Sequence, residues 1–381
     1  MARDSPGIRL KLSFESAKLL SLGTPAIPVF SLRITEHPMP TGSRDTGVLL
    51  DWILRSMGMV RRTTEEEEGA LHRILMEAFL PGPLRGWDSK QLGDRTGLSN
   101  TGIHHQMVKL RECGLVSAQL DGKWHRYVLR GGSMSAATAI IESQASAILK
   151  LRLSELSESV EQSDTRMEVD AEDEEDNFSI KITEPGPLGD TGAKSALMID
   201  LGLEGETKRA SDGLARGVFH ELCSSHRPIT LLALSERLSE TRGRVSTAVN
   251  RMRAASIVER APMVERLPQD IYAGLARQYD ARGEDWLMSR GGLGRLDPSA
   301  SQTLVSGVTD GSLDIDSVRE ALLQTPLDSQ RILLNTLGGR MPYGFRIAGA
   351  DGKAVSSRVM LGASRTLRRI RTVAERLDGL V

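Results

Sequence analysis

The chain repeats part of its own sequence. Four segments match a later counterpart in the same order: residues 30–38 with 178–185, 45–47 with 190–192, 70–79 with 214–223, and 92–116 with 234–258. The last pair aligns without a gap, from Leu92 through Val116 against Leu234 through Val258. One chance match would mean little, but four in order indicate a module of roughly 100 residues that is present twice.

The composition agrees with a folded, multidomain protein. At about 150 residues per domain, 381 residues predict two or three domains. Hydrophobic residues make up 39% of the chain, and the net charge is −1, so any nucleic-acid surface must be local. The sequence has neither the apolar core of a signal peptide nor an apolar run of about 18 residues. We therefore expect a soluble, cytoplasmic protein without membrane contact.

The residue pattern of the first module predicts a strand, three helices and a hairpin. Alternating apolar residues predict a strand at the start of each module, at 30–34 and 178–182. The helices are expected at 69–79, 89–96 and 100–112, with Asp88 and Ser99 as N-caps. Asp121-Gly122 favours a tight turn between strands at 115–119 and 123–129. This order is that of a winged helix, which makes the predicted class α+β, mainly α with small β-wings.

A long amphipathic stretch and an acidic block separate the two modules. Residues 134–163 carry apolar side chains on one face, which suits packing against the chain's own winged helix or dimerisation with a second copy. Residues 164–176 hold eight acidic residues against Arg166, which is typical of a disordered linker.

The pattern gives a plan for the whole chain. The predicted segments are an N-terminal extension with a strand (1–29), a first winged-helix domain (30–132), an amphipathic linker helix (133–163), an acidic disordered linker (164–177), a second winged-helix domain (178–290), a linker (291–312) and a basic C-terminal region (313–381). In the last region we expect helices at 318–323 and 330–337. A hairpin is expected to pair 345–347 with 355–360 around Asp351-Gly352, followed by a basic helix at 364–377.

The third helix of each module is the best candidate for a binding surface. Its apolar residues recur at helical spacing and should face the core: Ile103, Met107 and Leu110 in the first module, Val245, Val249 and Met252 in the second. Polar and basic side chains occupy the other positions. Between Thr241 and Arg260 there are five arginines against one glutamate, in a chain that is slightly acidic overall. A concentrated basic helix is the local pattern expected for phosphate contact.

The first module resembles a known family. Residues 98–116 (LSNTGIHHQMVKLRECGLV) look like the recognition-helix signature of the ArsR-like winged-helix superfamily of prokaryotic transcription regulators. Residues 121–129 (DGKWHRYVL) resemble the family's wing, and the likeness covers about residues 70–130. The second module is similar to the same pattern more loosely, with Ser256 at the position of Gly114 and a longer segment, 264–279, in place of the compact wing.

The resemblance implies double-stranded DNA as the partner, with the third helix in the major groove and the wing on the backbone. The residues expected to contact DNA are Asn100, Thr101, His104, His105, Lys109, Lys123 and Arg126 in the first module, and Arg242, Arg244, Ser246, Asn250 and Arg251 in the second. Arginine is the most frequent bidentate reader of guanine, so Arg242 or Arg244 could add sequence specificity.

Other functions have little support in the sequence. We expect no metal site and no cofactor: the Cys-x-Cys pair of metal-sensing relatives is missing, and neighbouring histidines on a helix diverge by about 100°. No residues form a catalytic motif, so the chain is not expected to be an enzyme. Two hypotheses remain, a sequence-specific transcription regulator with an unknown effector, and a winged-helix protein-interaction or chromosome-architecture or polymerase-associated factor without sequence readout.

Overall fold

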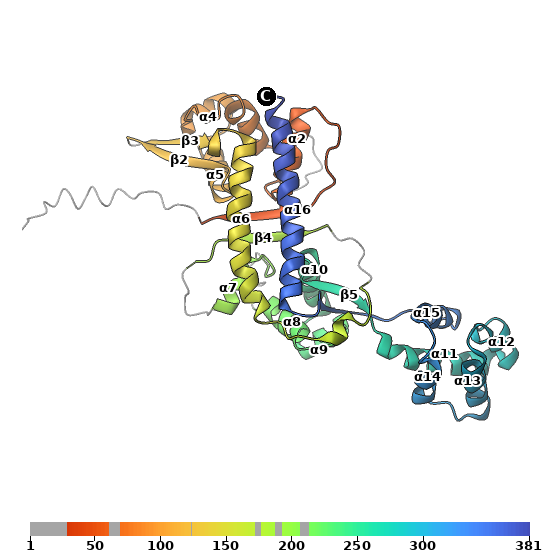
Figure 1. The fold of residues 1–381 in the computed structure, drawn as a ribbon. Helices are drawn as coiled ribbons and strands as arrows, with labels where there is room; N and C mark the ends of the chain where they lie inside the picture. Colours follow the sequence, from red (N-terminus) through yellow and green to blue (C-terminus); the bar gives the residue numbers. More distant parts are fainter. Residues whose placement is uncertain (1–28, 61–68, 123, 172–176, 187–192, 206–212) are drawn as a thin grey trace, which may run out of the picture.

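The computed structural model describes residues 29–60, 69–122, 124–171, 177–186, 193–205 and 213–381. The chain is mainly helical, with three small two-stranded antiparallel sheets in this described part. It forms two halves that lie on either side of a central pair of strands, and a helical lobe that projects from the second half (Figure 1). The fold is thus of the α+β class expected from the sequence.

The two halves use the same order of elements. The first half consists of β1 (Ser31–Thr35), α2 (Thr46–Ser56), α3 (Ala70–Ile74) with a π-turn (Leu75–Phe79), α4 (Ser89–Thr96), α5 (Asn100–Glu112), β2 (Val116–Asp121), β3 (Trp124–Leu129) and α6 (Met134–Ser157). The second half consists of β4 (Ser179–Thr183), α7 (Ala193–Asp200), α8 (Leu214–Cys223), α9 (Leu231–Arg237), α10 (Arg242–Ala254), β5 (Val258–Pro262), β6 (Tyr343–Ile347) and α16 (Gly352–Asp378). The helices α2 and α7 were not expected from the sequence.

The repeated strands pair with each other. β1 and β4 run antiparallel, with Leu32 opposite Ile182 and Ile34 opposite Ile180. All four of these side chains are buried, because alternate residues of each strand point to one face of the sheet. One continuous hydrophobic core therefore runs through both halves.

The long helices α6 and α16 form the second connection between the halves. They lie side by side and run antiparallel: the backbone N–H groups of Met134 and Ser135, at the start of α6, donate to the carboxylate of Asp378 at the end of α16. At the other end, the Ser356 hydroxyl donates to the Leu153 carbonyl. The apolar stripe of α6 is covered inside the chain mainly by α16, whereas the intramolecular partner expected from the sequence was the winged helix. A dimer through 134–163 stays a prediction.

The small sheets of the two halves pair equivalent residues. Val116 pairs with Leu129 where β2 meets β3, and Val258, the counterpart of Val116, pairs with Ile347 where β5 meets β6. A third segment adds an isolated bridge at matching places, Trp87 to Tyr127 and Ile229 to Phe345. β6 is therefore the second-half counterpart of β3, although residues 263–342 separate it from β5.

The separating residues fold into a helical lobe. Its helices are α11 (Leu267–Arg282), α12 (Glu284–Ser289), α13 (Pro298–Asp310), α14 (Ile315–Leu322) and α15 (Leu327–Thr336). They enclose a hydrophobic core of their own, distinct from the central one. The expected boundary at 290 and the linker at 291–312 are wrong: α13 lies in that stretch, and Leu293 and Leu304 are fully buried.

The expected C-terminal hairpin is also wrong. Residues 345–347 belong to β6, which pairs with β5, and residues 355–360 lie inside α16. The Asp351-Gly352 pair is not a hairpin turn. Asp351 is the N-cap of α16, and its carboxylate accepts a hydrogen bond from the backbone N–H of Ala354.

Part of the acidic block is ordered. Residues 164–167 form a 3₁₀ turn, and the Arg166 side chain is completely buried, where it donates to the carbonyls of Glu161 and Cys223 at 2.6 Å each. The expectation of a disordered linker is therefore wrong at 164–171. Residues 172–176 and the N-terminal strand expected within 1–28 lie outside the described residues. None of the described helices combines the length and apolar character needed to cross a membrane.

Candidate nucleic-acid interface

Local sequence fixes α5 where it was expected. Ser99 caps it by accepting from the backbone N–H of Gly102, and Asp88 caps the preceding helix through a reciprocal bond with Gln91. Ile103, Met107 and Leu110 are fully or almost fully buried, as their spacing predicted. The opposite side of α5 faces solvent.

The candidate residues of the first module are found on that exposed side of α5. Asn100, Thr101, His104, His105 and Lys109 are all exposed. The two imidazole rings stand edge to face with their centroids 6.3 Å apart. They project from the helix in different directions as two separate exposed polar groups.

The helix α10 repeats this arrangement with more positive charge. Val245, Val249 and Met252 are fully buried, whereas Arg242, Arg244 and Asn250 are exposed. Ser246 and Arg251 are partly buried. Arg244 forms an ion pair of 2.6 Å with Glu240, one turn earlier. Arg244 is exposed and Glu240 is partly exposed, so the pair costs little to open, since pairs near the surface contribute about 0–1 kcal/mol.

Arg126 has a different position from the helix residues. Its guanidinium donates to Asp121 on β2 at 3.2 Å and to Asp88 and Gln91 at the start of α4, at 3.3 Å each. It therefore fixes the β2–β3 hairpin to α4 in the absence of any partner. Lys123, the other residue expected on the hairpin, lies outside the described residues.

Pairs of arginines beside α4 and α9 were missed by the sequence reasoning. Arg85 and Arg95 both stack on Trp87, with guanidinium carbons 4.4 Å and 5.9 Å from the ring centroid. Their counterparts in the second half are Arg227 and Arg237. The gapless alignment of 92–116 with 234–258 already matched Arg95 with Arg237 and could have indicated the pair.

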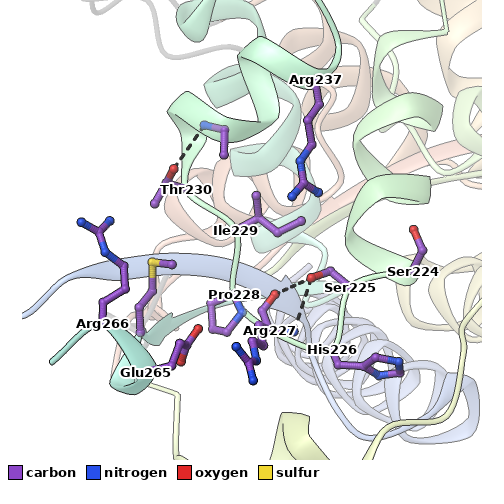
Figure 2. A pocket seen from close by; sticks show the side chains of 12 residues that line it. Ser224, Ser225, His226, Arg227, Pro228, Ile229, Thr230, Arg237, Glu265 and Arg266 are labelled. Atoms are coloured by element: carbon purple, nitrogen blue, oxygen red, sulfur yellow. Dashed lines mark hydrogen bonds between the residues drawn. The ribbon is translucent and has the colours of Figure 1, made fainter. Parts of the chain in front are cut away.

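In the second half a cavity lies beside the corresponding arginines, Arg227 and Arg237. It has a volume of about 540 Å³ and is lined by the loop between α8 and α9, the start of α9 and the first residues of the helical lobe. Figure 2 shows Arg237 reaching from α9 toward the loop that holds Ser225, with Arg266 on the far side. Arg227, Arg237 and Arg266 are all exposed, so positive charge extends from α10 onto this neighbouring surface.

Metal chemistry has no site in the described part of the chain, where no three His, Cys, Asp or Glu side chains are grouped to hold an ion. Burial raises the pKa of Cys113 and of Cys223 to about 12, so neither is a reactive thiolate. Comparison of the chain with protein-family models, with curated proteins and with solved structures finds no match.

Proposed function

We propose that this protein is a transcription regulator that binds double-stranded DNA through two winged-helix modules in one chain. In this proposal α5 and α10 enter the major groove, and the β2–β3 hairpin lies along the backbone. The modules are residues 30–132 and 178–262 with β6 added to the second. A site read by two unequal helices is asymmetric, so the operator is expected to lack palindromic symmetry.

One observation carries the proposal. At equivalent positions of the two halves, a helix buries its apolar residues and leaves a polar or basic face open to solvent. A solvated helix face is common in proteins, but here it recurs in two diverged copies. The apolar exposed stripe that a protein-docking helix would need is present on neither α5 nor α10.

The helical lobe favours the second candidate function, a protein-interaction factor. It takes the place of the wing tip in the second half, and it carries eight arginines against eleven acidic residues. A net negative lobe is poorly suited to the DNA backbone. We therefore assign DNA contact in the second module to α10 and the arginines beside α9, without a wing.

The test is selection of bound duplexes from a random DNA pool, followed by measurement of affinity against salt. The Arg242→Ala variant should lose one half of an enriched motif, and Lys109→Ala should weaken all sequences and reduce the slope of log K against log salt by about 1. Arg368→Ala is the matched control, because Arg368 is exposed on α16 outside both third helices. Absence of binding at low salt would refute the proposal, and binding without enrichment would replace it with an architectural role.

A further inference from the structure

The cavity beside α9 lies between the second module and the helical lobe. Its volume of about 540 Å³ is within the range of small-molecule sites. All of its lining residues fall between 224 and 266, in a stretch that the structure describes without a gap. They come from the loop between α8 and α9, from α9 itself, and from the residues that begin the lobe (Figure 2). A ligand in this cavity would therefore contact both the module and the lobe.

In the first half the equivalent place holds an aromatic ring. Trp87 is the counterpart of Ile229, and each of the two makes the isolated bridge that adds a third segment to its small sheet. The indole of Trp87 is buried, and its N–H donates to the Gly82 carbonyl at 3.1 Å. Arg85 and Arg95 both stack on this ring. The first half thus supplies an indole from its own chain to two guanidinium groups.

The second half keeps the two arginines but lacks the ring. Arg227 and Arg237 line the cavity together with Ile229, whose aliphatic side chain offers no aromatic face. The loop before Arg227 is also shorter, with three residues at 224–226 where the first half has five at 80–84. The missing indole and the shorter loop leave a space beside two cations that an aromatic ligand can fill.

The charged groups of the cavity define the rest of the ligand. Arg237 pairs with Glu221 at 3.1 Å, and Arg266 has an acidic neighbour one turn later at 3.9 Å. Arg227 and Glu265 also line the cavity and are exposed, and neither forms an ion pair within the described part of the chain. One cation and one anion are therefore open to a ligand, which suits a zwitterion better than a simple anion.

We infer that this cavity binds a free aromatic α-amino acid, such as tryptophan. The ring stacks on Arg237, in the place that Trp87 fills in the first half. The carboxylate pairs with Arg227 and the ammonium group with Glu265. An aromatic α-amino acid combines these three features in one small molecule.

Occupancy of the cavity would alter DNA binding. The helix α9 packs against α10, and Arg227 and Arg237 belong to the surface that we assign to DNA. A bound carboxylate neutralises Arg227, so the amino acid should weaken DNA binding. This regulatory consequence rests on the proposed function, whereas binding of the amino acid does not.

The test is calorimetric titration of the full chain with L-tryptophan. L-Leucine serves as the analogue without an aromatic ring, and tryptamine as the analogue without a carboxylate. We expect one L-tryptophan per chain and at least about tenfold weaker binding of both analogues, since the ring contact and the charge-assisted contact each contribute to affinity.

Variants separate the contributions of the individual side chains. Arg227→Met should weaken L-tryptophan about tenfold. Glu265→Gln should also weaken it, but should leave indole-3-propionate, which has no ammonium group, unchanged. Ile229→Trp, which copies the first half, should abolish binding, and urea titration shows whether this variant folds. Arg85→Met is the matched control and should stay within about twofold, because Trp87 fills the equivalent place there.

Three results would overturn the inference: no saturable binding of L-tryptophan, equal binding of either analogue, or unchanged binding in both Arg227→Met and Ile229→Trp. If Ile229→Trp does not fold, unchanged binding in both Arg227→Met and Glu265→Gln refutes the site instead. Titration with selected DNA, with and without L-tryptophan, separates the two proposals. L-Tryptophan binding by a chain that binds no DNA would support the site and refute the proposed function, and DNA binding without amino-acid binding would do the reverse.

Discussion

Two serines in the second half hold a backbone conformation that serine disfavours. Ser239 and Ser256 have φ values of 52° and 59°, and they are the only non-glycine residues with positive φ among those the structure describes. Each ends a helix, and each stands where the first half has a glycine: Gly97, with φ of 68°, and Gly114, with φ of 83°. The hydrogen bonds that end these helices form in spite of the serine: the Glu240 backbone N–H, for example, donates to the Ser235 carbonyl at 2.9 Å.

We expect Ser239→Gly to stabilise the protein. A left-handed conformation costs an L-residue about 1–2 kcal/mol, and glycine returns about 0.5–1 kcal/mol of this through the greater freedom of its unfolded chain. The expected net gain in the free energy of unfolding is about 0.5–1 kcal/mol. It is measured by urea titration of the full chain, followed by circular dichroism.

The reverse change and a control isolate the cause. Gly97→Ser should lose a similar amount, and the loss reports backbone strain alone, because a Cβ at Gly97 would meet nothing within 4 Å. Ser143→Gly, at an exposed position inside α6, should lose about 0.5 kcal/mol through helix propensity. If Ser239→Gly destabilises the chain as Ser143→Gly does, the reasoning from φ is wrong.

Three further predictions concern close packing, a buried cation and the thiols. Gly344→Ala should lower the free energy of unfolding by about 1–3 kcal/mol, because its Cβ would lie 2.8–3.0 Å from the loop before α9. Gly243→Ala, in open space on α10, should raise it by about 1 kcal/mol. Equal effects of the two substitutions on stability would contradict this prediction. Arg166→Met should lower the free energy of unfolding by roughly 3 kcal/mol, because it removes the hydrogen-bond donor of buried carbonyl groups. Arg166→Lys should recover part of that loss. If Arg166→Met leaves stability unchanged, these hydrogen bonds do not stabilise the protein. Since burial raises the pKa of Cys113 and Cys223 to about 12, the folded state keeps both protons at pH 9.5 while unfolded thiols, with pKa about 8.5, lose them. Stability should therefore fall by about 2–3 kcal/mol between pH 7.5 and 9.5 relative to a double Cys→Ala variant, and parallel pH profiles of the two proteins would refute this.

Sequence reasoning worked where local signals decide the structure. The three helices of the first module, their caps at Asp88 and Ser99 and the hairpin around Asp121-Gly122 are present as expected. Each of these depends on residues within a few positions of each other. The buried rows of α5 and α10 followed from helical spacing for the same reason.

Long-range partnerships could not be read in this way. β6 pairs with β5 across the intervening residues 263–342, and no local pattern indicates that partner. Asp351-Gly352 has the sequence of a turn, but an aspartate that starts a hairpin and one that caps a helix look alike until the next strand is located. The burial of Arg166 could not be predicted from the acidic residues around it. It depends on hydrogen bonds to the carbonyls of Glu161 and Cys223.

The two halves share one order of elements but differ at matching sites. In the first half Gly86 lies beside Arg126, and a Cβ at Gly86 would be 3.7 Å from the Cβ of that arginine. In the second half the large and small residues change places: Pro228, at the position of Gly86, lies beside Gly344, at the position of Arg126. A symmetric dimer must make every change twice, whereas a fused pair can alter one copy at a time. The lobe between β5 and β6 and the unequal helices α5 and α10 are differences of this kind, and in the proposed function the unequal helices read two different half-sites.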